Sequence, residues 1–242
     1  MSKPADSSVA SPNTPTALWA VLIATFLNSL ASGVAYNGLY FITDKAYGFT
    51  KEMQLYFGLL TGVTYIAGSL GAGPVIRALQ RSFPSLTTKK LLVSLMFVMA
   101  AIYCIPVVAW FAAPANNRLA TSAAVWVFMA LYSALCGMLW PVMDSFLPGG
   151  RMGHPLRAAI GKFNVTWSSS LIGSMLLVSW IPGSLQYGAS LAGIKLGELD
   201  AMVAGLCVAG SLHIASLFAL ARFPSKPAAH LHEDAHEVPA NY

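Results

Sequence analysis

Two apolar stretches of the chain each carry a stripe of polar and small residues with the same spacing. The members of each stripe fall at offsets 0, 3, 4, 7 and 11, which places each stripe on one face of a helix. The stripes consist of Thr25, Asn28, Ser29, Ser32 and Tyr36, and of Ser133, Cys136, Gly137, Trp140 and Asp144. Their hydroxyl, amide and indole groups can hydrogen-bond a small solute in a water-filled cavity, whereas contact with lipid is costly for them. The alternative is that both stripes pack helix against helix through their small residues.

A further polar group occurs in a later apolar stretch, where Asn164, Trp167 and Ser168 share one side of a helix. An asparagine at membrane depth needs a hydrogen-bond partner, which is either a neighbouring helix or a bound solute. The sequence leaves both alternatives open for Asn164. Taken together, the three stretches predict a substrate cavity lined by Asn28, Ser32, Tyr36, Trp140, Asn164 and Trp167.

Ionisable side chains are scarce in the middle of the apolar stretches. His213 is the only ionisable group there, and we expect it to be a hydrogen-bonded packing residue rather than a proton relay. Asp144 and Lys162 lie near the ends of their stretches, where water is within reach. Because no Asp or Glu occupies a midplane position, the predicted substrate is small and neutral or weakly polar.

Two other chemistries receive little support. Ser174 and His213 offer a nucleophile and a base, but no Gly-x-Ser-x-Gly-like element surrounds Ser174, so no enzyme is predicted. His230, His232 and His236 could hold a divalent ion weakly. The acidic, polar segment around them is more typical of a solvated linker. We therefore expect no metal and no cofactor.

The composition identifies the elements that hold these residues. Of the 242 residues, 56% are hydrophobic and 10% are charged, whereas soluble globular domains carry about 25% charged residues. Six stretches exceed the roughly 20 residues with which a helix crosses the hydrocarbon core. They are Ala17–Thr43, Met53–Leu79, Leu91–Ala113, Thr121–Leu147, Ala158–Ile181 and Ala201–Arg222. The sequence thus predicts an all-α membrane protein with six transmembrane helices, and the matching stripes in the first and fourth stretches predict a 3+3 repeat.

The charge distribution predicts the orientation. If the N-terminus is cytoplasmic, the inner segments hold 10 of the 14 Lys and Arg residues and the outer loops hold 4. The positive-inside rule then places both termini in the cytoplasm. Residues 1–16 are expected to be a disordered cytoplasmic tail, 17–222 the six-span bundle, and 223–242 a polar cytoplasmic tail or the start of a linker. Basic residues are not interleaved with aromatic ones, so no nucleic-acid partner is expected.

Local features complete the sequence-based expectations. Gly58 and Gly62 form a small-x-x-x-small pair, which favours close packing of two helices. Pro106 and Pro141 are expected to bend their helices. The three cysteines have neither pairing nor ligand spacing and are expected to be small core residues; they are Cys104, Cys136 and Cys207.

The most specific pattern runs from Arg157 through Gly161, Asn164 and Trp167-Ser168 to Gly173. With six spans, cytoplasmic termini and basic loops after spans two and four, it resembles the N-terminal half of a major facilitator superfamily transporter. The resemblance covers Ala17 to about Tyr242. It implies two three-helix repeats, movement of a small solute by alternating access, and a second six-span half. That half is expected from the same chain beyond residue 242, a separate chain or a homodimer, and the lipid bilayer is the remaining partner.

The resemblance is incomplete in the loop after the second span. The segment from Gly68 to Arg77 keeps the family's glycines and a base, but it lacks the family's Asp. Asp144 paired with Arg77 or Arg157 is expected to supply a substitute cytoplasmic gate. The missing acid also leaves open an alternative function, that of a non-transporting membrane assembly partner or a degenerate half-transporter.

Overall fold

The computed structural model describes residues 16–114, 117 and 121–228, and these residues form helices and no strand. Six helical segments are long and apolar enough to cross a membrane. They are Leu18–Lys45, Lys51–Ser82, Thr88–Ala112, Ser122–Asp144, Gly153–Leu191 and Glu198–Leu220. The prediction of an all-α chain with six candidate membrane spans is therefore confirmed.

Two of the six spans are interrupted. The first consists of α1 (Leu18–Gly33), a π-helical turn η1 (Val34–Gly38) and α2 (Leu39–Lys45). The third consists of α4 (Thr88–Ile102) and α5 (Cys104–Ala112). The other spans are the single helices α3 (Lys51–Ser82), α6 (Ser122–Asp144), α7 (Gly153–Leu191) and α8 (Glu198–Leu220).

The prolines explain part of this pattern. Pro106 has no N–H to give to the carbonyl of Ile102, and the α-helix is interrupted one residue later, at Tyr103. Pro141 lies inside the last turn of α6 without ending it. The fifth span differs most from its predicted bounds. A helix ending at Ile181, just before Pro182, was expected, but α7 continues through this proline to Leu191.

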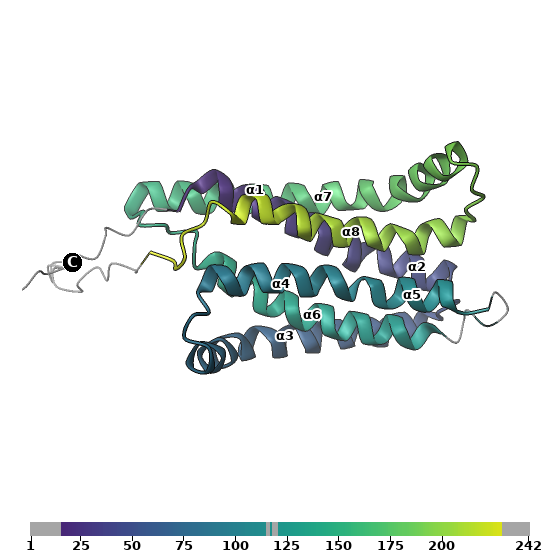
Figure 1. Ribbon diagram of the computed structural model, residues 1–242, viewed down its shortest axis with the longest axis horizontal. Helices are drawn as coiled ribbons and strands as arrows, with labels where there is room; N and C mark the ends of the chain where they lie inside the picture. Colours follow the sequence, from purple (N-terminus) through teal and green to yellow (C-terminus); the bar gives the residue numbers. More distant parts are fainter. Residues whose placement is uncertain (1–15, 115–116, 118–120, 229–242) are drawn as a thin grey trace, which may run out of the picture.

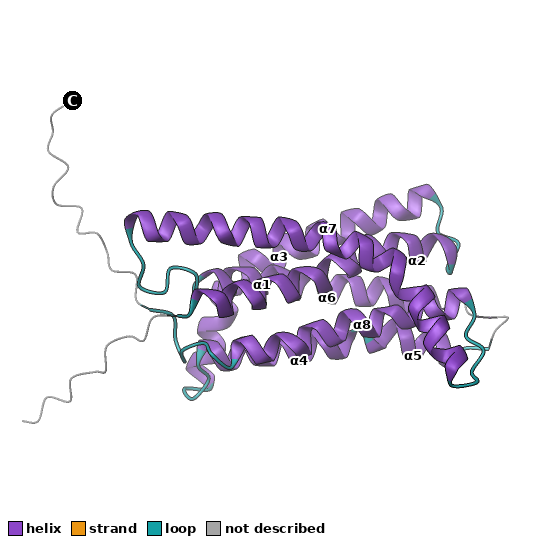
Figure 2. Cartoon of the chain, turned by 90° about the horizontal axis from the view of Figure 1, so that it is seen from above, coloured by secondary structure: helices purple, strands orange, loops and turns teal. Residues whose placement is uncertain are grey.

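The spans pack as a bundle along the long axis of the molecule (Figure 1). α3 packs mainly on α6, and α1 packs on α7 and α8. α4 contacts both α6 and α8, which places it between the two groups. Seen from above, all described elements are helices joined by short loops at the two ends of the bundle (Figure 2).

Glycine allows α3 and α6 to approach closely, although not at the expected positions. A Cβ on Gly137 would overlap the backbone of α3 at Tyr65 and Ser69, and one on Gly68 would overlap the Ala134 carbonyl. Gly62, in contrast, has no described atom within 4 Å of its Cβ position. The expectation of close backbone packing through Gly58 and Gly62 is therefore corrected: α3 and α6 approach at Gly68 of α3 and Gly137 of α6, whereas the Cβ position of Gly58 meets only a side chain, the Tyr40 hydroxyl at 2.8 Å.

The described chain begins and ends at the same end of the bundle (Figure 1). There the Lys89 ammonium donates to the carbonyls of Ala221 (2.7 Å) and Phe223 (3.0 Å), just after α8. Arg151, in the loop before α7, donates from Nη2 to the Thr16 carbonyl at 2.8 Å. Side chains from two loops thus hold the first and last described segments in place.

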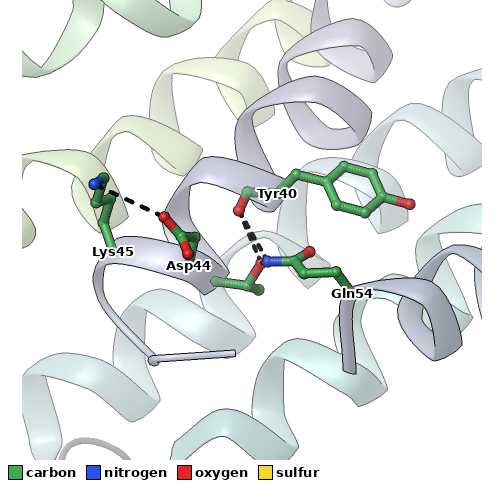
Figure 3. Close-up of polar contacts among 5 residues, drawn as sticks. Tyr40, Asp44, Lys45 and Gln54 are labelled. Atoms are coloured by element: carbon green, nitrogen blue, oxygen red, sulfur yellow. Dashed lines mark hydrogen bonds and ion pairs between the residues drawn. The ribbon is translucent and has the colours of Figure 1, made fainter. Parts of the chain in front are cut away.

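The opposite end is closed by packed aromatic rings. Phe49 stacks on Trp126 with ring centroids 5.6 Å apart, and Phe57 meets both rings edge-on. Tyr47 packs against Trp110 at 5.1 Å. Next to this cluster, Gln54 of α3 donates to the Tyr40 carbonyl at 3.1 Å and to Thr43 Oγ1 at 2.8 Å, as Figure 3 shows. These contacts join the first two spans at this end.

Candidate functional site

A groove of about 380 Å³ lies between α1, α3, α6 and α7. Its walls come from the first, second, fourth and fifth spans. It is lined by Ser29, Ser32, Tyr36, Tyr65, Trp140, Asp144, Phe163, Trp167 and Leu171. The groove runs from Asp144, at the end of the bundle with the termini, to Tyr36 near the middle of the first span. Hydroxyl, indole and carboxylate groups therefore line one concave surface.

Four of the six predicted cavity residues line this groove, namely Ser32, Tyr36, Trp140 and Trp167. Asp144, predicted as a gating residue, lines the same groove. Asn28 does not; it is fully buried behind the groove wall. Asn164 also lies outside the groove, on the exposed face of α7.

The local helix geometry explains how the first span presents its residues. Ser29 and Ser32 lie one turn apart on α1, and Tyr36 follows in the wide turn η1. The Tyr36 ring packs against the Tyr132 ring with centroids 5.9 Å apart. Its hydroxyl faces Ser133 and Cys136 of α6 but is buried without a hydrogen bond of good geometry. The Tyr36 hydroxyl is therefore covered by α6 and is not exposed to solvent in the groove.

Behind the groove, a buried hydrogen-bond network connects α1, α6 and α8. His213 Nδ1 lies 2.6 Å from Asn28 Oδ1, and His213 Nε2 lies 3.0 Å from the Tyr132 hydroxyl. That hydroxyl also bonds to Ser32 Oγ at 3.1 Å, and Ser32 Oγ lies 3.6 Å from Cys136 Sγ. Because Ser32 also lines the groove, the network links the groove surface to the core.

The neighbours of His213 define its protonated nitrogen. Asn28 Nδ2 donates to the Ala24 carbonyl at 2.8 Å, so its Oδ1 must face the imidazole as an acceptor. A neutral imidazole then donates from Nδ1 to Asn28 Oδ1, and its unprotonated Nε2 faces the Tyr132 hydroxyl, whose single proton goes either to Nε2 or to Ser32 Oγ. No carboxylate contacts the ring among the described residues. His213 is therefore a hydrogen-bonded core residue, as expected.

The three predicted gating residues are not joined in this conformation. Among the described residues, the one ion pair is between Asp44 and Lys45 at 3.8 Å, at the other end of the bundle (Figure 3). Asp144 lines the groove without a cationic partner, and the Arg77 guanidinium folds back along its own helix toward Gly73. Arg157 is exposed on the first turns of α7. Their pairing stays a prediction for another conformation.

Several residues of the site had weak sequence signals. Tyr65 belongs to the polar face of α3 and lines the groove opposite the first span. Phe163 and Leu171 lie one turn before and after Trp167 on α7, a spacing that places all three on one face. Tyr132 bonds to both Ser32 and His213. It lies one residue before the polar stripe of the fourth span, and the sequence did not predict that it takes part in the network.

Residues of the other chemistries occupy separate positions. Ser174 accepts a hydrogen bond from Asn37 at 3.2 Å and donates to the Leu171 carbonyl at 2.6 Å, whereas His213 bonds to Asn28 and Tyr132. No hydrogen bond joins Ser174 to His213. The tail histidines His230, His232 and His236 lie outside the described residues.

The cysteines do not all belong to the core. Cys136 is buried, as expected, but Cys104 and Cys207 are exposed on the outside of the bundle. When a span is apolar on all sides, its sequence does not show which side faces the core of the bundle. The prediction that Cys104 and Cys207 are core residues was therefore wrong.

Comparison with known proteins adds no identification. The sequence matches no protein-family profile, and no curated protein or solved structure is significantly similar to it.

Proposed function

We propose that this chain is one half of a secondary membrane transporter of the major facilitator type, which moves a small neutral or weakly polar solute by alternating access. The observation that carries the proposal is the groove itself. It gathers Ser32, Tyr36, Trp140 and Trp167 from the first, fourth and fifth spans. Aromatic faces with a few hydrogen-bonding groups are suited to a small polar organic solute.

The helix contacts support the proposed 3+3 repeat. In such a repeat, spans one, two and three correspond to spans four, five and six, so α1 corresponds to α6, α3 to α7 and α4 to α8. The contact between α3 and α6 then corresponds to the contact between α7 and α1. In the same way, the contact between α4 and α6 corresponds to the contact between α8 and α1, and the contact between α4 and α8 corresponds to itself. All these contacts are present. One departure is the α7–α8 contact, which has no counterpart of comparable extent between α3 and α4. Inverted repeats of this kind are typical of secondary transporters, with the substrate site at their interface.

A second six-span half completes the proposed transporter. The groove is one concave wall, and the two helices that flank it, α3 and α7, are the least buried spans. Their exposed apolar side chains include Leu55, Leu59, Val63, Leu70, Ile172 and Leu176. A second half, whether a continuation of the chain, a separate chain or a second copy, would cover part of this surface and enclose the groove.

Charge pairing completes the proposed cycle. Asp144 is at the end of the groove near the termini, and Arg77 and Arg157 belong to the two helices beside it. Closure of that end brings a carboxylate and a guanidinium into range of each other. Opening exposes Asp144, as in the present conformation.

The test is the accessibility of the groove to water and to solutes. Single cysteines at Trp140, half-buried in the groove wall, and at Trp167 are introduced into a chain whose three cysteines are replaced by alanine. After reconstitution, a membrane-impermeant maleimide should label both positions, and a transported solute from a panel of sugars, polyols and amino acids should slow the labelling. Cysteine at Ile172, exposed on α7 but outside the groove, is the matched control and should label poorly because lipid or the second half, and not water, covers it.

The alternative function is that of a non-transporting assembly partner. It is favoured by the broad apolar faces of α3 and α7, which suit a protein partner as well as a second half. Under this alternative the groove is filled by the partner or by lipid. Absent labelling at both Trp140→Cys and Trp167→Cys, in a chain that is folded and inserted, would therefore favour the assembly partner over the transporter.

A further inference from the structure

A second cavity, separate from the groove, lies in the half of the bundle away from the termini. It has a volume of about 720 Å³ and is enclosed by the η1–α2 segment, the second half of α7 and the first turns of α8. Cavities of about 300–1,000 Å³ are the size that holds small organic ligands. Most of its wall is apolar and consists of Val34, Ile42, Met175, Val178, Met202 and Leu206.

The cavity has a structural origin in irregular backbone. The π-helical turn Val34–Gly38 lies on one side of it and Pro182 of α7 on the other. Gly183, which follows this proline, has no described atom within 4 Å of its Cβ position. The π-helical turn of the first span and the proline of α7 thus lie beside the same cavity, and the side chains around them do not fill the space between the two helices.

The cavity opens toward the outside of the bundle and not toward the groove. Phe41, Met175 and Ser179, which line it, are exposed. Asn37, which also lines it, donates to Ser174 at 3.2 Å and so bridges η1 to α7. In a chain that spans a membrane, an opening on this outer surface faces the acyl chains of the bilayer. An apolar cavity there loses dispersion contacts unless a hydrocarbon chain fills it.

One end of the cavity is polar. Glu198, the first residue of α8, and Gln186 of α7 lie there. Gln186 donates from Nε2 to the Leu196 carbonyl at 3.3 Å, which fixes it against the loop before α8. The Glu198 carboxylate is exposed and has no ion pair among the described residues. A carboxylate beside an apolar cavity matches an amphiphile whose head group is a hydrogen-bonding cation.

We propose that this cavity binds one acyl chain of a membrane lipid that carries a primary ammonium head group, with the ammonium donating to Glu198. Phosphatidylethanolamine has this chemistry. Phosphatidylcholine has the same chains and the same charge but no N–H donor on its head group. The proposal requires only that the chain spans the bilayer, and it does not depend on transport through the groove.

The test uses the full chain in vesicles that contain a trace of lipid with a photoreactive diazirine on its acyl chain. Cross-linking of the phosphatidylethanolamine probe should concentrate on peptides that contain Met175 and Met202. It should exceed cross-linking of the phosphatidylcholine probe about two- to five-fold, the upper range of one exposed ion pair. Glu198→Gln should remove this preference without removing cross-linking.

Two further variants separate the cavity from the general lipid surface. Ser179→Trp places a large side chain in the cavity opening and should reduce cross-linking of both probes at Met175 and Met202. Ile172→Trp adds the same side chain to an exposed position of α7 outside the cavity and should leave cross-linking unchanged. Equal cross-linking by the two probes, or equal effects of the two tryptophans, would overturn the proposal.

Discussion

His213 Nδ1 lies 2.6 Å from Asn28 Oδ1, and this contact joins the middle of α8 to the middle of α1 inside the bundle. Asn28 has the sequence position of a cavity residue, but its amide is used within the core. Both of its polar atoms are occupied, one by the imidazole and one by the Ala24 carbonyl. Its neighbour on the same face, Ser32, reaches the groove as well as the network.

The first prediction concerns the stability contributed by this contact. Asn28→Ala leaves a buried imidazole N–H without an acceptor, so we expect a loss of about 1 kcal/mol of unfolding free energy. Asn164→Ala removes the same group from an exposed position and should cost much less. The measurement is the unfolding midpoint of both variants in detergent. Equal midpoints would contradict the assignment of Asn28 to the core network.

The second prediction concerns the α3–α6 interface. Gly137→Leu places a side chain on the α3 backbone at Tyr65 and Ser69, and overpacking of this kind costs about 1–3 kcal/mol. Gly62→Leu lies on α3 where no described atom is close, so it should be tolerated. Thermal unfolding of the two variants separates the outcomes. If Gly62→Leu were the more damaging, the small-x-x-x-small pair would be the true contact.

The third prediction tests the groove as a solute site. Trp167→Ala removes an aromatic wall of the groove, whereas Trp180→Ala removes a tryptophan from the exposed face of the same helix outside it. We expect counterflow of a transported solute to fall about ten-fold in the first variant, equivalent to about 1.4 kcal/mol of binding. The second variant should retain wild-type counterflow. Similar losses in both would place the solute elsewhere.

The fourth prediction addresses the gate. Asp144→Arg introduces a like charge opposite Arg77 and Arg157 and should abolish counterflow if closure requires an ion pair. A second change, Arg157→Asp or Arg77→Asp, should restore it for the residue that is the true partner. Rescue by neither exchange would remove Asp144 from the proposed gate. Expression and membrane insertion of each variant are monitored in parallel.

The fifth prediction concerns the second half. The transport-competent particle should have a protein mass of at least twice the 25.6 kDa of this chain. Native mass spectrometry from the source membrane, after capture with an antibody to residues 1–16, measures it. A particle of 25.6 kDa that still catalyses counterflow in vesicles would show that a second half is unnecessary.

The helices were predictable because each is long and apolar, which is a property of local sequence. Five of the six predicted spans end within three residues of their helices at both ends. The exception, α7, continues past Pro182 because a single proline removes one backbone donor and the remaining turns keep theirs. The predicted end at Ile181 was the end of the apolar stretch, and hydropathy does not show that the helix continues beyond it.

The site was predictable in part. Ser32, Tyr36 and Trp140 follow from stripes at helical spacing, since such a stripe reports which residues share a face. The spacing does not show whether that face lines a groove or packs against another helix. Asn28 therefore had the pattern of a groove residue although it bonds to His213, a partner 185 positions away in the sequence. The cavity near Glu198 had no signal, because its shape depends on a π-helical turn that no single residue type dictates.

The two hydrogen bonds from the Lys89 ammonium, together with the bond from the Lys89 amide to the Ser225 carbonyl at 3.2 Å, join the start of α4 to the segment that follows α8. Further along, Gly210 of α8 fits closely against Ala100 and Tyr103. The third and sixth spans are thus joined both at the end near the termini and near the middle of α8, and we expect them to move as one rigid unit. Any rocking motion within this bundle then has to occur in the other four spans, and these are the spans that line the groove.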